Sequence, residues 1–342
     1  MRDGARRPIL EPDPTAPELP FRENGRQGAS HARVVSPIAP TAPLRPRAPR
    51  LALRRPSDRA LAVLALLGAN AMWGTSVVTS RAVLDQIPPL TLAVLRAAIA
   101  LGVLLPFVLR AGRRPALGVL PALMGLTGLA LFYPAFYVGI GYASAANASL
   151  VVDGGIPVMT ALLAVVVLRE RATPARVLGV AISLAGVGAI ALRGAAGLDG
   201  SVRGNLLLVG CALLIGVYTV VGRRAFAGHG LLAVTTGSLV YGTLLLIPAA
   251  AVELATVGAG RPSLTDVGLL LYLGAGVAAL AYVLLGFALR RLEAGLVGVF
   301  SNVAPLVGVA AAVVVLGEPL TLLQVAGGAL IGGGVWLAAR AA

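Results

Sequence analysis

Lysine is absent from this 342-residue sequence, and charged residues of every kind make up only 12% of it. Soluble domains average about 25% charged residues, so this chain has too little polar surface to enclose its core in water. The single cysteine, Cys211, excludes a disulfide framework and any cysteine-rich metal site. With two widely spaced histidines, no HExxH pair and no glycine-rich phosphate loop, we expect neither a metal nor a cofactor.

Apolar residues account for 58% of the chain and, from residue 58 onward, gather into ten runs separated by short charged or Gly/Pro breaks. The runs cover 60–80, 88–109, 116–141, 146–168, 175–193, 204–222, 231–252, 265–289, 294–316 and 320–339. Each is close to the length of about 20 residues that a helix needs to cross a bilayer. Because lipid requires the backbone to be satisfied within helices, the sequence predicts an all-α integral membrane protein with ten transmembrane helices. The division of 116–168 depends on a turn predicted at 142–147.

Residues 1–57 differ from the rest, with 11 prolines and 11 arginines against 5 acidic residues and no long apolar run. Such a segment cannot bury enough surface to offset the entropy lost on ordering it. We expect a disordered cytoplasmic tail rather than a signal peptide, because the first apolar run starts only near Leu61. Recognition of a protein partner by this Pro/Arg segment is the alternative.

All 28 basic residues are arginine, and the formal net charge is +14. If the N-terminus is placed in the cytoplasm, eleven arginines beyond residue 60 fall on the inner side and four on the outer side. This is the bias of cytoplasmic loops, so we expect a multi-pass protein of the cytoplasmic membrane with both termini inside. Because the arginines flank apolar runs, the charge indicates a lipid partner and no nucleic acid.

The chain contains an internal repeat. A shift of 148 residues aligns Pro157 with Pro305, Glu170 with Glu318, Thr173 with Thr321, Gly179 with Gly327 and Gly186 with Gly334. Five spans per half is an odd number, so the two predicted repeats, 58–197 and 198–342, must cross the membrane in opposite senses. Inverted five-helix repeats of this kind are typical of secondary transporters. A non-transporting scaffold that arose by duplication is the alternative.

Several sequence features resemble EamA-type carriers of the drug/metabolite transporter superfamily. They are Met72-Trp73-Gly74, Leu95-Arg96-Ala97, and the Pro157…Glu170…Gly179 turn with its copy Pro305…Glu318…Gly327. The resemblance covers 60–340 and implies ten helices around a central cavity that moves a small solute by alternating access. In the second half Tyr218-Thr219 replaces the Trp-Gly pair, so the repeat is looser there.

Two ionisable residues fall inside predicted spans, Arg96 in the second and Asp153 in the fourth. Such residues are costly in lipid and are functional candidates by default. Counted from the outer ends of their spans, both lie roughly 10–12 Å deep at about 1.5 Å per residue. We expect them to face the cavity, where they pair or bind a charged group of the solute, and Asp153 is the candidate for proton coupling. A permanent ion pair that joins two helices is the alternative.

The second repeat offers Ser301 and Asn302 at the position of Asp153. Each of these segments precedes a proline, Pro157 or Pro305, and a proline within a span frees the carbonyl four residues earlier. A freed carbonyl beside a polar side chain is a candidate contact for the solute, with a simple packing kink as the alternative.

Aromatic side chains are expected to line the cavity, although helix packing is the alternative for each. The candidates are Trp73, Tyr137 and Tyr218, then Tyr133, Tyr241 and Tyr282, with Asn70, Asn147 and Thr219 as weaker polar candidates. Glu170 and Glu318 are expected to cap the helices that follow them, a structural role. The Gly328-xxx-Gly332 pattern indicates close helix contact within the protomer or at a homodimer interface.

The sequence as a whole predicts a secondary transporter for a small metabolite or drug-like solute, with export favoured and proton coupling left open. We do not expect an enzyme, because no catalytic motif is present. A membrane-embedded enzyme that modifies lipid remains the alternative, whereas a channel is disfavoured by the lack of a filter-like motif or rings of charge.

Overall fold

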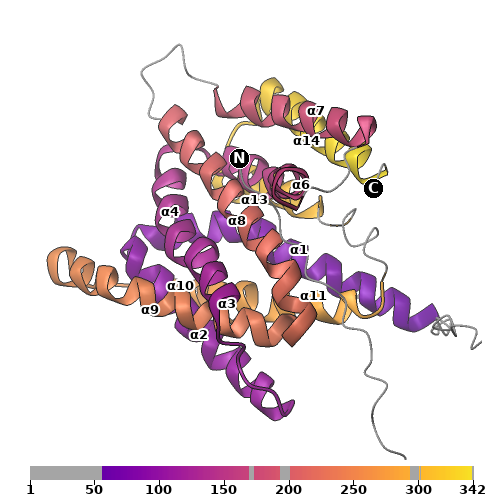
Figure 1. The fold of residues 1–342 in the computed structure, drawn as a ribbon. Helices are drawn as coiled ribbons and strands as arrows, with labels where there is room; N and C mark the ends of the chain where they lie inside the picture. The colour runs from indigo at the N-terminus through magenta and orange to yellow at the C-terminus, as the bar shows by residue number, and fades with distance from the viewer. Residues whose placement is uncertain (1–55, 169–172, 193–200, 293–299, 301, 341–342) are drawn as a thin grey trace, which may run out of the picture. The chain divides into compact units, whose positions relative to one another are not determined.

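Apolar helices make up the part of the chain that the computed structural model describes, which comprises residues 56–168, 173–192, 201–292, 300 and 302–340 (Figure 1). No strand occurs among these residues. The fold is therefore all-α, as the apolar runs predict. The predicted N-terminal tail lies outside the described residues up to position 55.

The first half contains α1 (Pro56–Leu84) and α2 (Pro89–Arg110), followed by two composite helices and α7 (Pro174–Ala191). The first composite helix joins α3 (Val119–Gly125), the π-helix η1 (Leu126–Leu131) and α4 (Phe132–Tyr142). The second joins α5 (Ala145–Ala148), the π-helix η2 (Ser149–Asp153) and α6 (Gly155–Leu168). The break between α4 and α5 confirms the turn predicted at 142–147.

The second half contains α8 (Ser201–His229), α9 (Leu231–Val257), a composite helix, α13 (Val303–Leu316) and α14 (Leu322–Arg340). The composite helix joins α10 (Leu264–Leu271), the π-helix η3 (Tyr272–Leu280) and α11 (Ala281–Leu289). Local sequence sets several of these ends. Ser263 and Asp266 form a capping box at the start of α10, and Gly317 ends α13 in the left-handed conformation with φ 66°.

Eight helices of the described chain are long and apolar enough to cross a membrane. They are Asp58–Leu84, Pro89–Arg110, Val119–Tyr142, Ala145–Val166, Pro174–Ala191, Val202–His229, Leu231–Val257 and Leu264–Leu289. Two further apolar helices, Val303–Leu316 and Leu322–Ala338, are shorter. The start of the predicted ninth run, 294–299, lies outside the described residues, so a total of ten spans stays a prediction.

The main helix pairs join the first half of the chain to the second. They are α7 with α14, α1 with α13, α2 with α9, and α4 and α6 with α8. Figure 1 shows α7 and α14 side by side. Because the principal partners come from opposite halves, the described helices form one compact unit rather than two separate bundles.

The crossing of α7 and α14 brings together the glycines that define the sequence repeat. Its contacts are Gly179 with Gly334, Gly186 with Gly327, and the Ser183 hydroxyl, which donates to the Ile331 carbonyl oxygen at 3.0 Å. A methyl group added at Gly186 would lie 2.6 Å from the carbonyl oxygen of Gly327, so only glycine permits this approach. Early residues of α7 meet late residues of α14, and the two equivalent helices therefore run antiparallel, as inverted repeats require.

Candidate functional site

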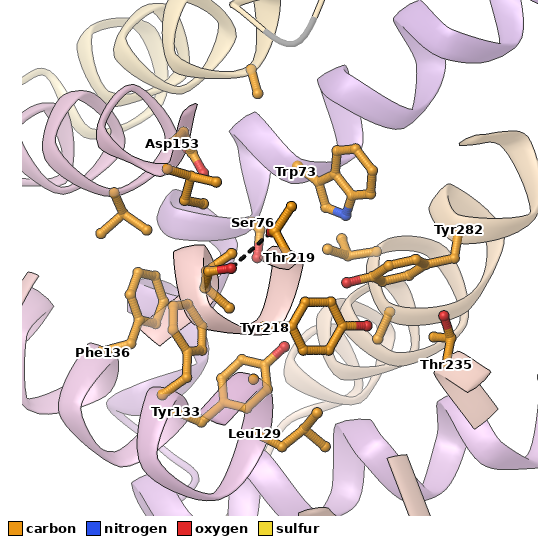
Figure 2. Close-up of a pocket in the computed structure, with 18 of the residues that line it drawn as sticks. Trp73, Ser76, Leu129, Tyr133, Phe136, Asp153, Tyr218, Thr219, Thr235 and Tyr282 are labelled. Carbon is orange, nitrogen blue, oxygen red and sulfur yellow. Dashed lines mark hydrogen bonds between the residues drawn. The ribbon is translucent and has the colours of Figure 1, made fainter. Parts of the chain in front are cut away.

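A pocket of about 340 Å³ lies between helices of the two halves (Figure 2). The first half contributes Asn70, Trp73, Ser76, Val77, Arg96, Gly128, Leu129, Phe132, Tyr133, Phe136, Val152, Asp153, Ile156 and Pro157. The second half contributes Ile215, Tyr218, Thr219, Thr235, Ser238, Leu239, Val277, Ala278, Tyr282, Leu285 and Ala304. A mostly apolar wall with a few polar groups is the usual form of a small-molecule site.

Arg96 projects from α2 into this wall and is only 3% exposed. Its guanidinium carbon lies 4.6 Å from the centre of the Tyr133 ring, a cation–π contact. Its Nη1 donates a long hydrogen bond of 3.5 Å to the Tyr137 hydroxyl, while its Nε is buried without a partner. A buried guanidinium with an unused donor is well placed to receive an anionic group.

Asp153 is the last residue of η2 and reaches the same pocket. Its Oδ2 is buried without a hydrogen-bond partner, which is costly for a carboxylate that stays charged. Asp153 and Arg96 form no ion pair with each other, although the structure describes both residues. The alternative of a permanent ion pair is therefore wrong. Arg96 Nε and Asp153 Oδ2 are instead both without a hydrogen-bond partner.

Aromatic rings form much of the pocket wall. Trp73 packs edge-on against Tyr282, with ring centres 5.6 Å apart, and Figure 2 shows Tyr218 beside Tyr282 and Tyr133 near Leu129. The Tyr218 ring lies so close to Gly128 that a methyl group there would be 2.5 Å from the ring. The aromatic wall offers apolar contact and, through ring faces, attraction for cations.

All three π-helical segments border the pocket. Gly128 and Leu129 come from η1, Val152 and Asp153 from η2, and Val277 and Ala278 from η3. A π-helical turn widens the helix and disturbs its hydrogen-bond ladder, and such turns often occur at functional sites.

The pocket lies closer to one end of the bundle than to the other. We define the arginine-rich end as the end where α2 and α11 finish and α9 and α13 begin, and the Glu318 end as the opposite one. Thr235 is four residues after the start of α9, and Leu285 is four before the end of α11. At the Glu318 end, no pocket residue of the described helices lies within five residues of the end of a single or composite helix.

Comparison with known proteins identifies the family. The model of the EamA-like transporter family matches residues 60–192 and again residues 202–340. The chain belongs to this EamA-like transporter family. The "Uncharacterized transporter YetK" of Bacillus subtilis is 27% identical over 285 residues, which cover 81% of this chain and 86% of that protein.

Two more relatives are informative. The "Probable terminal-alkyne amino-acid exporter" of Streptantibioticus cattleyicolor is 30% identical over 288 residues, which cover 82% of this EamA-like chain and 93% of the relative. A solved structure described only as "Crystal structure of protein" has a TM-score of 0.59 and 26% identity, and the match covers 82% of this chain and 96% of that one. This EamA-like protein is therefore a multi-pass membrane transporter that handles small molecules.

The structure brings most of the predicted site residues of the EamA-like chain into one place. Those in the pocket wall are Trp73, Arg96, Asp153, Pro157 and Tyr218, with Asn70, Tyr133, Thr219 and Tyr282. Tyr137 is buried next to Arg96 and is not part of the wall. Asn302 directly precedes α13 and is likewise outside the wall. Ser301 lies outside the described residues.

Other candidates have structural roles instead. Tyr241 accepts a hydrogen bond from the Gly118 amide at 3.2 Å, away from the pocket. Asn147 donates to Asn205 at 3.4 Å and accepts from Gln324 at 2.8 Å. Pro157 and Pro305 each occupy the third position of an α-helical segment. Pro157 thereby lies within the composite helix of α5, η2 and α6, shortly after the π-helical turn that ends at Asp153.

Glu318 caps a helix, but that helix is α5, and the prediction that it caps the following helix, α14, was wrong. Its carboxylate accepts hydrogen bonds from the amides of Ala145 and Ala146, at 2.8 and 2.9 Å, at the start of α5. The start of α14 is closed by its own Gln324, which accepts from the Thr321 amide at 2.9 Å. The equivalent Glu170 lies outside the described residues.

Sequence reasoning missed five polar and aromatic residues of the wall: Ser76, Phe132, Phe136, Thr235 and Ser238. They come from three different helices and carry no linear motif. The only signal that pointed toward them was the neighbouring cluster of aromatic residues at 132–137. In the part of the chain that is described, no group of three or more His, Cys, Asp or Glu side chains could hold a metal ion.

Proposed function

We propose that this EamA-like transporter is a secondary carrier that exports a small amphipathic zwitterion of amino-acid type by alternating access. The observation that carries the proposal is one pocket that holds a buried guanidinium and a carboxylate, each with an unpartnered atom. A solute with a carboxylate and an ammonium group would satisfy both at once. Because unpaired buried charges are costly, such a solute gains binding free energy that an uncharged molecule lacks.

The rest of the wall suits the apolar part of such a solute. Leu129, Phe132, Phe136 and Ile156 offer apolar surface beside the two charges. The relative from Streptantibioticus cattleyicolor, whose name describes an amino-acid exporter, supports the same class of solute. We therefore assign the guanidinium of Arg96 to the carboxylate of the solute, and Asp153 to its ammonium group.

The distribution of charge supports export as the direction of transport. The arginines of the described loops lie mainly at the arginine-rich end of the bundle, which the positive-inside rule places in the cytoplasm together with both termini. The pocket lies nearer to this end, so a solute would enter it from the cytoplasm. This arrangement supports export across the cytoplasmic membrane.

Asp153 also gives the carrier a means of coupling to protons. A carboxylate without a protein partner alternates between a proton and the ammonium group of the solute, because only one of the two can occupy it. Exchange of the two ligands at one carboxylate would make the carrier an antiporter, with a proton moving inward for each solute that leaves.

Efflux from proteoliposomes tests the proposal. The purified protein is reconstituted, the vesicles are loaded with radiolabelled leucine, methionine or phenylalanine, and efflux is followed with and without a pH gradient. We expect Arg96→Gln and Asp153→Asn each to slow efflux at least about tenfold, a change of ~1.4 kcal/mol, and Asp153→Asn also to abolish the response to the gradient.

Two matched variants control for the loss of charge alone. Arg261 is exposed, Asp266 is half-buried, and both lie outside the pocket, so Arg261→Gln and Asp266→Asn should stay within about twofold of the unmodified protein. Efflux by both pocket variants at the unmodified rate would overturn the assignment of Arg96 and Asp153. No efflux of any of the three amino acids by the unmodified protein would overturn the proposed class of solute.

A further inference from the structure

Glu318 occupies a junction between the two halves of the chain. It directly follows Gly317, and the amides of both residues donate to α13 carbonyls, Gly317 to Val313 at 3.1 Å and Glu318 to Ala312 at 3.2 Å. These bonds fix the backbone from which the carboxylate projects. Its side chain is 17% exposed, whereas that of its ion-pair partner Arg81 is 41% exposed, so solvent screening weakens the ion pair more than the amide contacts of Glu318.

Three donors from the first half converge on this carboxylate. The amides of Ala145 and Ala146 donate to Oε1 and Oε2, and the Arg81 Nη1 donates to Oε1 at 3.2 Å. Arg81 also donates to the carbonyl oxygen of Ala143 at 3.2 Å. The end of α1, the turn between α4 and α5, and the loop before α14 are therefore joined by one cluster, Arg81, Ala143, Ala145, Ala146 and Glu318, which we call the Glu318 clamp.

The Glu318 clamp lies between the pocket and the Glu318 end of the bundle. Ala145, Ala146 and Ala148 are at most 1% exposed, and the pocket begins only at Val152, further along the same composite helix. The start of α5, between the clamp and the pocket, is therefore buried by close packing. Asp153 follows Ala145 by eight residues, about 12 Å at 1.5 Å per residue, so the helix that the clamp holds also carries the carboxylate of the site.

A second polar contact reinforces the closure. Gln324 on α14 donates to the Asn147 side chain at 2.8 Å and to the Ser144 hydroxyl at 3.4 Å. Asn147 in turn donates to Asn205 on α8 at 3.4 Å. The start of α5 is therefore held by two contacts from the second half of the chain. Glu318, in the loop before α14, provides one, and Gln324, in α14, provides the other.

We propose that the Glu318 clamp is the gate that closes the pocket toward the Glu318 end, and that the structure shows this gate shut. Release of the carboxylate frees the start of α5 from the loop before α14 and opens a path to Asp153. The inference rests on the proposed alternating-access function, because a gate matters only to a carrier whose pocket opens at each end in turn.

Cysteine accessibility tests the gate without any solute. In a Cys211→Ser background, Ser76→Cys places a thiol in the pocket wall, and a membrane-impermeant maleimide is added to right-side-out or inside-out vesicles. Leu320→Cys, at a position 47% exposed next to the clamp, identifies the vesicles in which the Glu318 end faces the reagent. We expect the pocket thiol to react slowly from that side in the otherwise unmodified protein.

Loss of the clamp should open that side. Glu318→Gln is expected to raise the labelling rate from the Glu318 end at least about tenfold, and Arg81→Gln to raise it less, because the two amide contacts remain. Asp266→Asn, which removes a carboxylate that caps only its own helix, should leave the rate unchanged. A rate for Glu318→Gln within twofold of the unmodified protein overturns the gate.

The remaining outcomes are also decisive. If Glu318→Gln is not recovered from the membrane, Arg81→Gln decides alone, and an unchanged labelling rate overturns the gate. Rapid labelling of the unmodified pocket from the Glu318 end overturns it as well. Because labelling requires no solute, a failure of amino-acid efflux with the expected labelling pattern contradicts the proposed solute and leaves the gate supported.

Discussion

Replacement of Glu253 by alanine should destabilise the protein by about 2 kcal/mol, because it removes the cap from the start of α2. The Glu253 carboxylate, on α9, accepts hydrogen bonds from the Leu90 amide at 3.1 Å, the Thr91 amide at 2.7 Å and the Thr91 hydroxyl at 2.9 Å. Loss of a helix cap costs ~0.5–2 kcal/mol, and each hydrogen bond to a charged group contributes ~1.5–3 kcal/mol when well shielded. Glu253 is only half-buried, so water recovers part of this loss.

Equilibrium unfolding in mixed detergent micelles measures the effect, with helix content followed by circular dichroism. Thr91→Ala removes only the hydroxyl contact and should cost about 0.5–1 kcal/mol. In the double variant the two losses should not add, because both changes remove the same Thr91–Glu253 contact. A free energy of unfolding for Glu253→Ala within about 0.5 kcal/mol of the unmodified protein would refute the assignment of this cap.

Two further predictions concern glycines. Gly186→Ala should cost about 1–3 kcal/mol of stability in the same unfolding assay, because the added methyl group meets the backbone of α14. Gly188→Ala in the same helix is the control: its methyl group meets nothing within 4 Å, so the change should be neutral or stabilising. Equal effects of the two substitutions would contradict the crossing of α7 and α14. Gly128→Ala should weaken binding of the transported amino acid by about tenfold, measured by equilibrium dialysis, because it displaces the Tyr218 ring. Gly210→Ala meets nothing within 4 Å and serves as its control, and unchanged affinity in both would contradict a role for Tyr218.

The helical class and the internal repeat could be predicted because both leave regular traces in the sequence, whereas the crossing of α7 and α14 could not. Long apolar runs indicate helices in lipid wherever they occur. The glycines of the two copies are 148 residues apart in the sequence. In the structure, Gly179 and Gly186 of one copy contact Gly334 and Gly327 of the other. That Arg96 and Asp153 line one pocket could be predicted because a charge within an apolar run is rare.

The partners of these residues could not be predicted. A sequence shows which residues are close along one helix, but the pocket is assembled from helices of both halves, and its distances depend on how they pack. Glu318 illustrates the limit. Its position before α14 indicated a cap for that helix, whereas packing places its carboxylate on the amides of α5, 173 residues away from Ala145. The π-helical segments likewise have no motif of their own.

The antiparallel crossing of α7 and α14 constrains how the protein is made. α14 begins 148 residues after α7, so α7 enters the bilayer before the partner for its glycine surface has been synthesised. The same delay applies to α1 with α13 and to α2 with α9. The early helices must therefore remain in lipid without these partners until the late ones insert. Until then, the surface around Gly186 is exposed within the bilayer, where an interrupted translation product would present it to membrane proteases and chaperones.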